Sequence, residues 1–404
     1  MKPLKQIYYV LLSVLGVMFL PYIGAWIKYN GNFPKDYFDF PALSAPDKAG
    51  FSVAAFSMAA AFFLAVVVLY AFPRVYGFKK VKFTPAKPSA KIPLPIWFWV
   101  GLVAWGVTLF VTWAKFEEPR WLLNWAYIPL FWGFTLMLDG WVYVRADRNS
   151  LLSKSPHEII GIGAAAISGW MLFEYLNFFV DDNWFYPKGN IVPVGEYTIY
   201  AIIGSSGLMP AVFEIYNLMN TFPAFRHRYD RGPRIATSRR ARNIILIGAL
   251  AALFSISFFP EVMFGVLWIS PLIVFTVVLE DLGIWTPLTP IKDGNWSPFL
   301  KYSLCYVIYG LLLECWNFFN ATHDPSNPAN ITAYTPAHWV YSIPYISKFH
   351  VFEMPIVGYL GYLPFGAYCA VWWILCAFLL NIPTQFDHDE YSEVRAEPLE
   401  IQTS

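Results

Sequence analysis

The sequence predicts an all-α, polytopic transmembrane bundle of about ten helices, and composition and charge placement are the reasons. Of the 404 residues, 57% are hydrophobic and 14% are charged, whereas soluble domains carry roughly 25% charged residues. The charged residues collect in short runs between long uncharged stretches. Most of these stretches approach the roughly 20 apolar residues that a helix needs to cross a bilayer. This alternation is typical of membrane spans joined by loops.

The first span is expected at 7–27, directly after a short basic start. A secretory signal peptide has a shorter apolar core and a small-residue cleavage site, so we interpret this segment as an uncleaved helix. The span at 243–259 is short, which indicates a tilted or partly inserted helix. The other spans are expected at 50–72, 95–113, 122–144, 158–180, 197–221, 262–282, 299–319 and 356–380.

Lysine and arginine in the loops predict the orientation, because cytoplasmic loops carry an excess of them. With ten spans, three strongly basic loops fall on one side, and loops on the other side are mixed or acidic. This places both termini in the cytoplasm of a cell (inner or plasma) membrane. The tail 384–404 is then cytoplasmic and expected to be disordered. The basic residues are Arg74, Lys79, Lys80, Lys82, Lys87, Lys91, Arg145, Arg148, Lys154, Arg226, Arg228, Arg231, Arg234, Arg239, Arg240 and Arg242.

An internal repeat is indicated by three matches in the same order along the chain. Residues 134–139 match 275–280, and 174–179 match 314–319, with polar residues among the matched positions. The third match joins 208–210 to 362–364. Two four-helix units facing the same way would be parallel repeats, related by an axis along the membrane normal. The expected divisions are 1–94, a helix pair with a basic loop; 95–242 and 243–383, the two repeats; 320–354, a long outer loop within the second; and 384–404, the polar tail.

A Glu-x-x-Asn tetrad occurs three times inside predicted spans. Ionisable groups inside a membrane are costly and are functional candidates by default. Spacing of three places both side chains on one helix face, so we expect the amide to donate to the carboxylate and orient it. Two of the tetrads lie near the outer face and predict a paired substrate- or ion-binding site at the repeat interface. The alternative is a structural role, which for the third tetrad is an interhelical clamp. The tetrads are Glu174/Asn177, Glu314/Asn317 and Glu214/Asn217.

Three further carboxylates are weaker candidates. Asp139 and Glu280 hold matching positions near the cytoplasmic ends of two spans. The alternative for Asp139 is an interfacial ion pair with Arg145 or Arg148. Glu353 is expected to begin the last helix, where a carboxylate is favourable.

The outer loop 320–354 is rich in aromatic residues and includes His338 and His350. We expect it to fold over the helix ends as a cap, with a re-entrant course left open. The histidine spacing fits no standard metal site, so no metal and no cofactor are expected. The four cysteines form no CxxC pair and are interpreted as buried thiols.

Glycine and proline interrupt two predicted spans, around 204–210 and 358–366. Matching broken helices in two repeats are typical of a transport site, whereas small residues also permit close helix packing.

Three functions are therefore left open. The first is a transporter or ion-coupled carrier using the paired carboxylates. The second is a membrane enzyme acting on a lipid or isoprenoid at the outer leaflet, with one carboxyl as acid and aromatic rings shielding a cation. The third is a scaffold subunit of a membrane complex. The expected partners are the lipid bilayer, a small solute, ion or lipid, and other membrane subunits. A net charge of +1, with no basic soluble domain, argues against nucleic acid.

Overall fold

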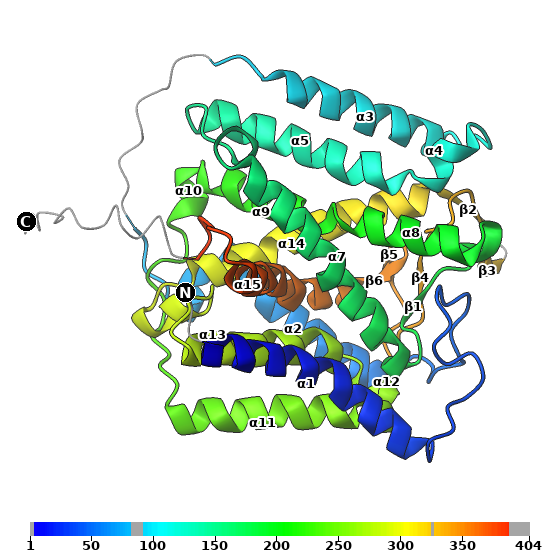
Figure 1. The fold of residues 1–404 in the computed structure, drawn as a ribbon, viewed down its shortest axis with the longest axis horizontal. Helices are drawn as coiled ribbons and strands as arrows, with labels where there is room; N and C mark the ends of the chain where they lie inside the picture. Colours follow the sequence, from blue (N-terminus) through cyan, green and yellow to red (C-terminus); the bar gives the residue numbers. More distant parts are fainter. Residues whose placement is uncertain (1–3, 82–91, 325–326, 388–404) are drawn as a thin grey trace, which may run out of the picture.

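The computed structural model describes residues 4–81, 92–324 and 327–387, and this part of the chain is mostly helical. Within it, eight helices are long and apolar enough to cross a membrane. Two more predicted spans form α5 (Tyr127–Arg145) and α13 (Val266–Asp281), which run alongside the eight (Figure 1) but do not meet the same length and hydropathy requirements. The chain is therefore a helical membrane protein, and ten crossings stay a prediction. The eight are Leu4–Lys28, Val53–Ala71, Ile96–Trp113, Pro156–Val180, Val194–Asn220, Arg239–Phe258, Ser297–Phe319 and Ile356–Leu380.

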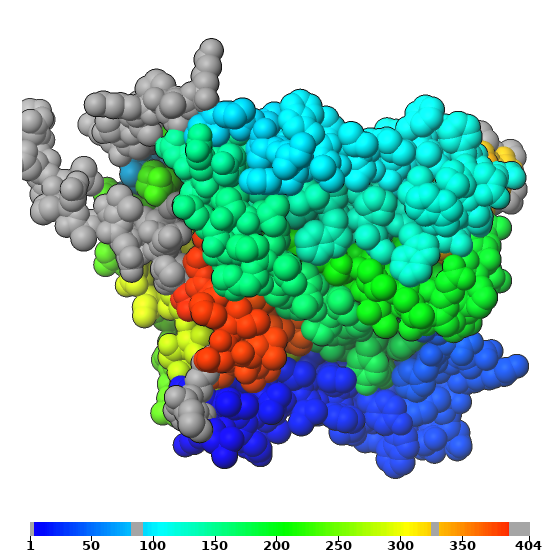
Figure 2. Space-filling view, turned by 45° about the horizontal axis from the view of Figure 1, so that its top comes forward, coloured from blue at the N-terminus to red at the C-terminus, as the bar shows by residue number. Residues whose placement is uncertain are grey.

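The long helices lie side by side along the long axis of the molecule (Figure 1). At one edge α3 (Ile96–Trp113) packs on α5, and at the opposite edge α1 (Leu4–Lys28) packs on α11 (Arg239–Ser255). The centre holds α7 (Pro156–Asn177), α14 (Ser297–Phe319) and α15 (Tyr362–Leu380). Figure 2 shows α3 and the N-terminal segment on opposite edges of the surface.

Close helix contacts rely on glycine, as is common where helices meet in a membrane. A Cβ on Gly101 of α3 would lie 2.5 Å from the backbone oxygen of Gly133 in α5. A Cβ on Gly366 of α15 would lie 2.2 Å from the backbone oxygen of Tyr302 in α14. These glycines set the spacing of the bundle, and the second holds α15 against the helix that carries Glu314.

Several spans are broken. The span at 194–220 divides into α8 (Val194–Ser205) and α9 (Leu208–Asn220), with Gly207 at the junction. The last span begins as a 3₁₀ helix, η6 (Ile356–Gly361), before α15. Both breaks fall where glycine and proline predicted interruptions. Short helices complete the connections: α4 (Arg120–Asn124), α6 (Leu151–Lys154), α10 (Pro223–Arg226) and α12 (Pro260–Met263), with 3₁₀ turns η1 (Pro73–Tyr76), η2 (Phe178–Val180), η3 (Gly189–Ile191), η4 (Ile256–Phe258) and η5 (Thr289–Asp293).

Three small antiparallel sheets gather at one end of the bundle, the right-hand end in Figure 1. They pair β2 (Ala321–Asp324) with β3 (Asn327–Ala333), and β5 (His350–Val351) with β6 (Met354–Pro355). The third pairs β1 (Trp184–Phe185) with β4 (Val340–Tyr341), and Trp184 lies opposite Tyr341. This sheet joins the loop after α7 to the loop after α14, two segments that lie far apart in the sequence.

Two expectations need correction. Glu353 does not begin the last helix, because it lies in the turn between β5 and β6. The tail does not leave the bundle at Thr384, whose hydroxyl donates to Glu158 in α7 at 2.5 Å. Phe386 is buried, and its ring lies 4.7 Å from that of Phe213. Residues 388–404 lie outside the described part of the chain.

Candidate functional site

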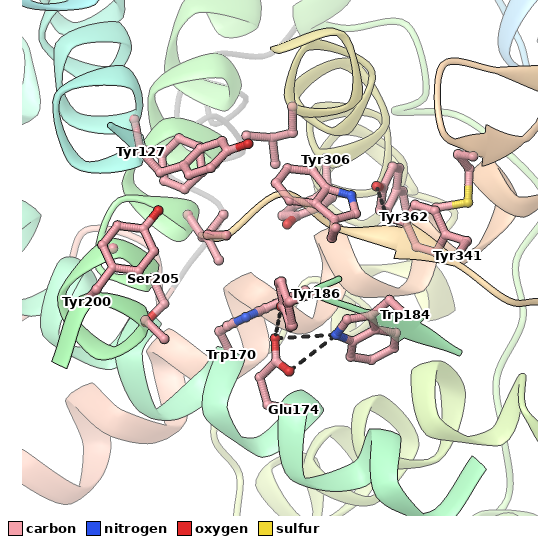
Figure 3. A pocket seen from close by; sticks show the side chains of 18 of the residues that line it. Tyr127, Trp170, Glu174, Trp184, Tyr186, Tyr200, Ser205, Tyr306, Tyr341 and Tyr362 are labelled. Carbon is pink, nitrogen blue, oxygen red and sulfur yellow. Dashed lines mark hydrogen bonds between the residues drawn. The ribbon is translucent and has the colours of Figure 1, made fainter. Parts of the chain in front are cut away.

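Glu174, on the last turn of α7, is nearly buried and is held by two aromatic donors (Figure 3). The hydroxyl of Tyr186 donates to its Oε1 at 2.5 Å. The indole Nε1 of Trp184 lies 3.3 Å from both carboxylate oxygens. Both donors come from the short loop after α7, so this loop positions the carboxyl group.

Glu314 on α14 is fully buried and has the same kind of neighbours. Its Oε1 accepts from Trp339 Nε1 at 3.2 Å, from Tyr341 OH at 2.7 Å and from Tyr362 OH at 2.5 Å. Its Oε2 has no hydrogen-bond partner among the described residues. A buried acceptor without a partner is costly and rare.

The two asparagines do not orient the carboxylates in the predicted way. Asn177 Nδ2 donates to the backbone oxygen of Trp184 at 2.8 Å, and its Oδ1 accepts from the backbone of Asn183. Asn317 makes two bonds with Trp339, in which Nδ2 donates to its backbone oxygen at 2.8 Å and Oδ1 accepts from its backbone N at 3.1 Å, and Oδ1 also accepts from Tyr127 OH at 3.2 Å. Each amide therefore holds in place the segment that carries the tryptophan and the tyrosine. These two aromatic side chains donate to the glutamate.

A cavity of about 100 Å³ lies between the two carboxylates' donors. Glu174 lines it directly, whereas Glu314 lies behind Tyr341 and Tyr362, whose side chains line the wall. No lysine, arginine or histidine is among the described residues that line it. The remaining walls are aromatic, from Tyr127, Phe131, Trp170, Trp184, Tyr186, Tyr197, Tyr200, Trp268, Tyr306 and Trp339, with small and aliphatic residues between them.

The third tetrad lies apart from this cavity. Glu214 on α9 is fully buried, and neither carboxylate oxygen has a hydrogen-bond partner among the described residues. It interacts electrostatically with Asp139 and with Asn217 on the next turn of its own helix. The clamp interpretation of Glu214 and Asn217 stays untested.

Asp139 and Glu280 both serve the loops that follow their helices. Asp139 accepts from Trp97, from the Ser150 hydroxyl and from the backbone of Leu152, at 2.8–2.9 Å. The structure therefore gives Asp139 neutral partners in place of the arginine pairing considered above. Arg145 instead donates to the Thr221 hydroxyl at 2.7 Å.

Glu280 accepts from the hydroxyls of Thr286 and Thr289 at 3.0 and 2.9 Å. Both hydroxyls come from the loop after α13, so Glu280 secures that loop much as Asp139 secures the loop after α5.

The outer loop brings two histidines to Glu353. His323 Nε2 lies 2.6 Å from Glu353 Oε1, and the fully buried His338 lies 3.6 Å from the same oxygen. Burial lowers the pKa of His338 to about 3, so its ring is neutral. Burial raises the pKa of Glu353, and His323 partly offsets this. His350 is exposed on β5, away from this group. No cluster of three metal-ligating side chains occurs in 4–81, 92–324 or 327–387.

Several residues of the site were not predicted from the sequence. A Trp-x-Tyr string follows the Glu174/Asn177 and Glu314/Asn317 tetrads, at Trp184/Tyr186 and at Trp339/Tyr341, and this repeated string was the available signal. Lys301 on α14 was also missed. It is 2% exposed, and its Nζ donates to Asn220 Oδ1 at 2.6 Å.

Comparison with protein-family models, with curated proteins and with solved structures found no match. The chemistry of the site therefore has to be argued from its own geometry. A carboxyl group in an aromatic cavity can donate or accept a proton, or balance a cation that the ring faces also attract.

Proposed function

We propose that the protein is a membrane-embedded enzyme that protonates an unsaturated, lipid-dissolved substrate, with Glu174 as the proton donor. The observation that carries the proposal is a carboxyl group that opens into a cavity walled by aromatic rings and without a basic side chain among the described lining residues. A polar solute would find few hydrogen-bonding groups there. An apolar molecule with a reactive double bond, such as an isoprenoid, fits these walls.

The reaction requires only proton transfer. The carboxylic acid of Glu174 adds its proton to one carbon of a double bond, which leaves a carbocation and a carboxylate. Loss of a proton from a neighbouring carbon to the carboxylate then forms a new double bond and restores the acid, so atoms and electrons balance. The ring faces of Trp170, Trp184 and Trp268 stabilise the cation.

Glu314 supplies a second proton acceptor without touching the substrate. The hydroxyls of Tyr341 and Tyr362 line the cavity and also donate to Glu314. A proton leaving the substrate on that side passes through one hydroxyl to the Glu314 carboxylate; Glu174 then takes up a proton from water and Glu314 releases one to water, which returns both groups to their starting states. Glu314 is therefore a positioning and relay group, and Glu174 is the catalytic one.

Deuterium incorporation tests the proposal. Membranes that contain the protein are incubated in deuterated water with the lipid extract of cells that lack the gene, and lipids are analysed by mass spectrometry. One lipid should gain a deuterium on carbon with the wild-type protein and with Glu117→Gln, an exposed control, but not with Glu174→Gln. Equal labelling with wild-type and Glu174→Gln protein would refute the role of Glu174.

An ion-coupled carrier is the second candidate, because the α8–α9 and η6–α15 breaks both adjoin the cavity through Leu208 and Tyr362. Broken helices beside a binding site are typical of secondary transporters. A substrate flux into proteoliposomes that is abolished by Glu174→Gln, without carbon-bound deuterium, would favour transport over the enzyme.

A further inference from the structure

Helix α2 (Val53–Ala71) packs only loosely on the rest of the bundle. None of its 19 residues is buried. It is tied at its two ends: Ser52 N donates to Tyr345 O at 2.9 Å, and Tyr70 OH donates to Leu300 O at 3.0 Å. Arg228 adds bonds to the backbone oxygens of Tyr70 and Ala71. The helix is thus a strap that is fixed at both ends and only half-buried along its middle, where Phe63 packs against the core.

A groove of about 930 Å³ lies beneath this strap. Its other walls are α13, the first turns of α14, and η6 with the start of α15. Among the described residues that line it, Glu261 is the one with an acidic or basic side chain. Glu261 is already engaged, because it accepts from Ala49 N at 2.9 Å and from Tyr345 OH at 3.2 Å. The remaining surface is almost wholly apolar.

The groove adjoins the cavity at the carboxylates. Five residues line both spaces: Trp184, Trp268, Tyr341, Met354 and Tyr362. Trp184 donates to Glu174, and Tyr341 and Tyr362 donate to Glu314. A chain lying in the groove would therefore bring one end to the side chains that donate to the two carboxylates, next to Glu174 in the adjoining cavity.

The apolar walls of the groove and the attachment of α2 at both ends restrict what can occupy it. Protein interiors hold few voids larger than a water molecule, and apolar walls do not hold water. A helix from another subunit, about 10–12 Å wide, would have to thread beneath α2, which is fixed at both ends. A hydrocarbon chain can slide in sideways from the surrounding bilayer.

We propose that the groove binds the hydrocarbon chain of a membrane lipid, which enters sideways beneath α2 and presents its reactive end to Glu174. This deepens the proposed enzymatic function, on which the identification of the lipid as substrate rests. The substrate class is a lipid with a long linear or isoprenoid chain. The groove, at about 930 Å³, is within the roughly 300–1,000 Å³ that is typical of ligand pockets.

Photo-crosslinking tests the groove directly. The protein is reconstituted into phosphatidylcholine–phosphatidylglycerol vesicles that contain a phospholipid with a diazirine on its acyl chain. Crosslinks on Trp268 and Leu272, which line the groove, are mapped by mass spectrometry. Ala59→Trp fills the groove from α2, and Ala61→Trp is the control, because Ala61 is exposed on the same helix and does not line it.

Crosslinks should be found in the wild-type protein and in Ala61→Trp, and should fall to background in Ala59→Trp. Ala59→Trp should also lose deuterium incorporation, whereas Glu174→Gln should keep the crosslinks and lose incorporation. Crosslinks that are absent from the groove, or equal in the two alanine variants, would overturn this inference and leave the role of Glu174 standing. Crosslinks that respond as expected, with incorporation that ignores Glu174, would overturn the proposed function and leave the groove standing.

Discussion

Replacing Asn177 by alanine should destabilise the protein, because this side chain fastens the loop that carries Trp184 and Tyr186. It removes two buried hydrogen bonds, to Trp184 O at 2.8 Å and from Asn183 N at 2.9 Å. Leaving a buried partner unpaired costs about 1–3 kcal/mol. The free energy of unfolding should therefore fall by about 2–4 kcal/mol. Asn317→Ala should destabilise the protein to a similar extent, since Asn317 is fully buried and loses two bonds with Trp339 and one from Tyr127 OH.

The natural cysteines provide the assay. Cys305 and Cys369 are buried free thiols, so a thiol-reactive dye reports unfolding in detergent micelles without added labels. Asn190→Ala is the matched control, because Asn190 is exposed and surface substitutions usually change stability by less than about 0.5 kcal/mol. If Asn177→Ala and Asn190→Ala unfold alike, the amide is not the anchor described here.

Three further outcomes are expected. Tyr362→Phe removes one of three donors to Glu314 Oε1 and should slow deuterium incorporation while costing about 1–2 kcal/mol of stability by the thiol assay; an unchanged rate would exclude a relay through this hydroxyl. Burial raises the pKa of Asp182 to about 7, so the folded state binds more protons than the unfolded one, and local stability should fall as pH rises from about 4 to about 7. Hydrogen exchange in 181–186, corrected for intrinsic rate, should quicken over that range, and the effect should be absent from Asp182→Asn; the same pH response in both proteins would contradict it. Gly366→Ala places a Cβ against the Tyr302 backbone oxygen and should lower the free energy of unfolding by about 1–3 kcal/mol. An unchanged thermal unfolding temperature would show that α14 and α15 can move apart to accept the methyl group.

The spans and the carboxylates could be predicted because both depend on the cost of polar groups in hydrocarbon. A long uncharged run has few alternatives to a membrane helix, and Glu174 and Glu314 stand out within such runs. The structure places both on central helices, α7 and α14, beside one cavity or its wall. Glu353 was misassigned for the opposite reason: it lies outside the candidate spans, where a glutamate with a proline two residues later is as compatible with a hairpin turn as with a helix start.

The aromatic donors were not predicted because their distance along the chain from the tetrad differs between Glu174/Asn177 and Glu314/Asn317. Trp184 follows Asn177 by seven positions, and Trp339 follows Asn317 by 22. A comparison at constant offset cannot align these pairs, although the hydrogen bonds are alike.

The strap formed by α2 was also invisible to sequence reasoning. Its residues are apolar on every side, and lipid is as apolar as a protein neighbour, so hydropathy alone does not reveal which face meets the bundle.

The central place of α15 has a consequence for biosynthesis. It is the last helix along the chain, yet it packs on α7, α13 and α14, and Trp372 and Trp373 fill the space beside Gly169 and Gly161 of α7. The ribosome must synthesise α1–α14 before this helix can enter the bilayer. The earlier helices therefore cannot pack fully until α15 is inserted. A chain truncated before α15 would have an unfilled space at the centre of the bundle, which quality-control proteases could attack.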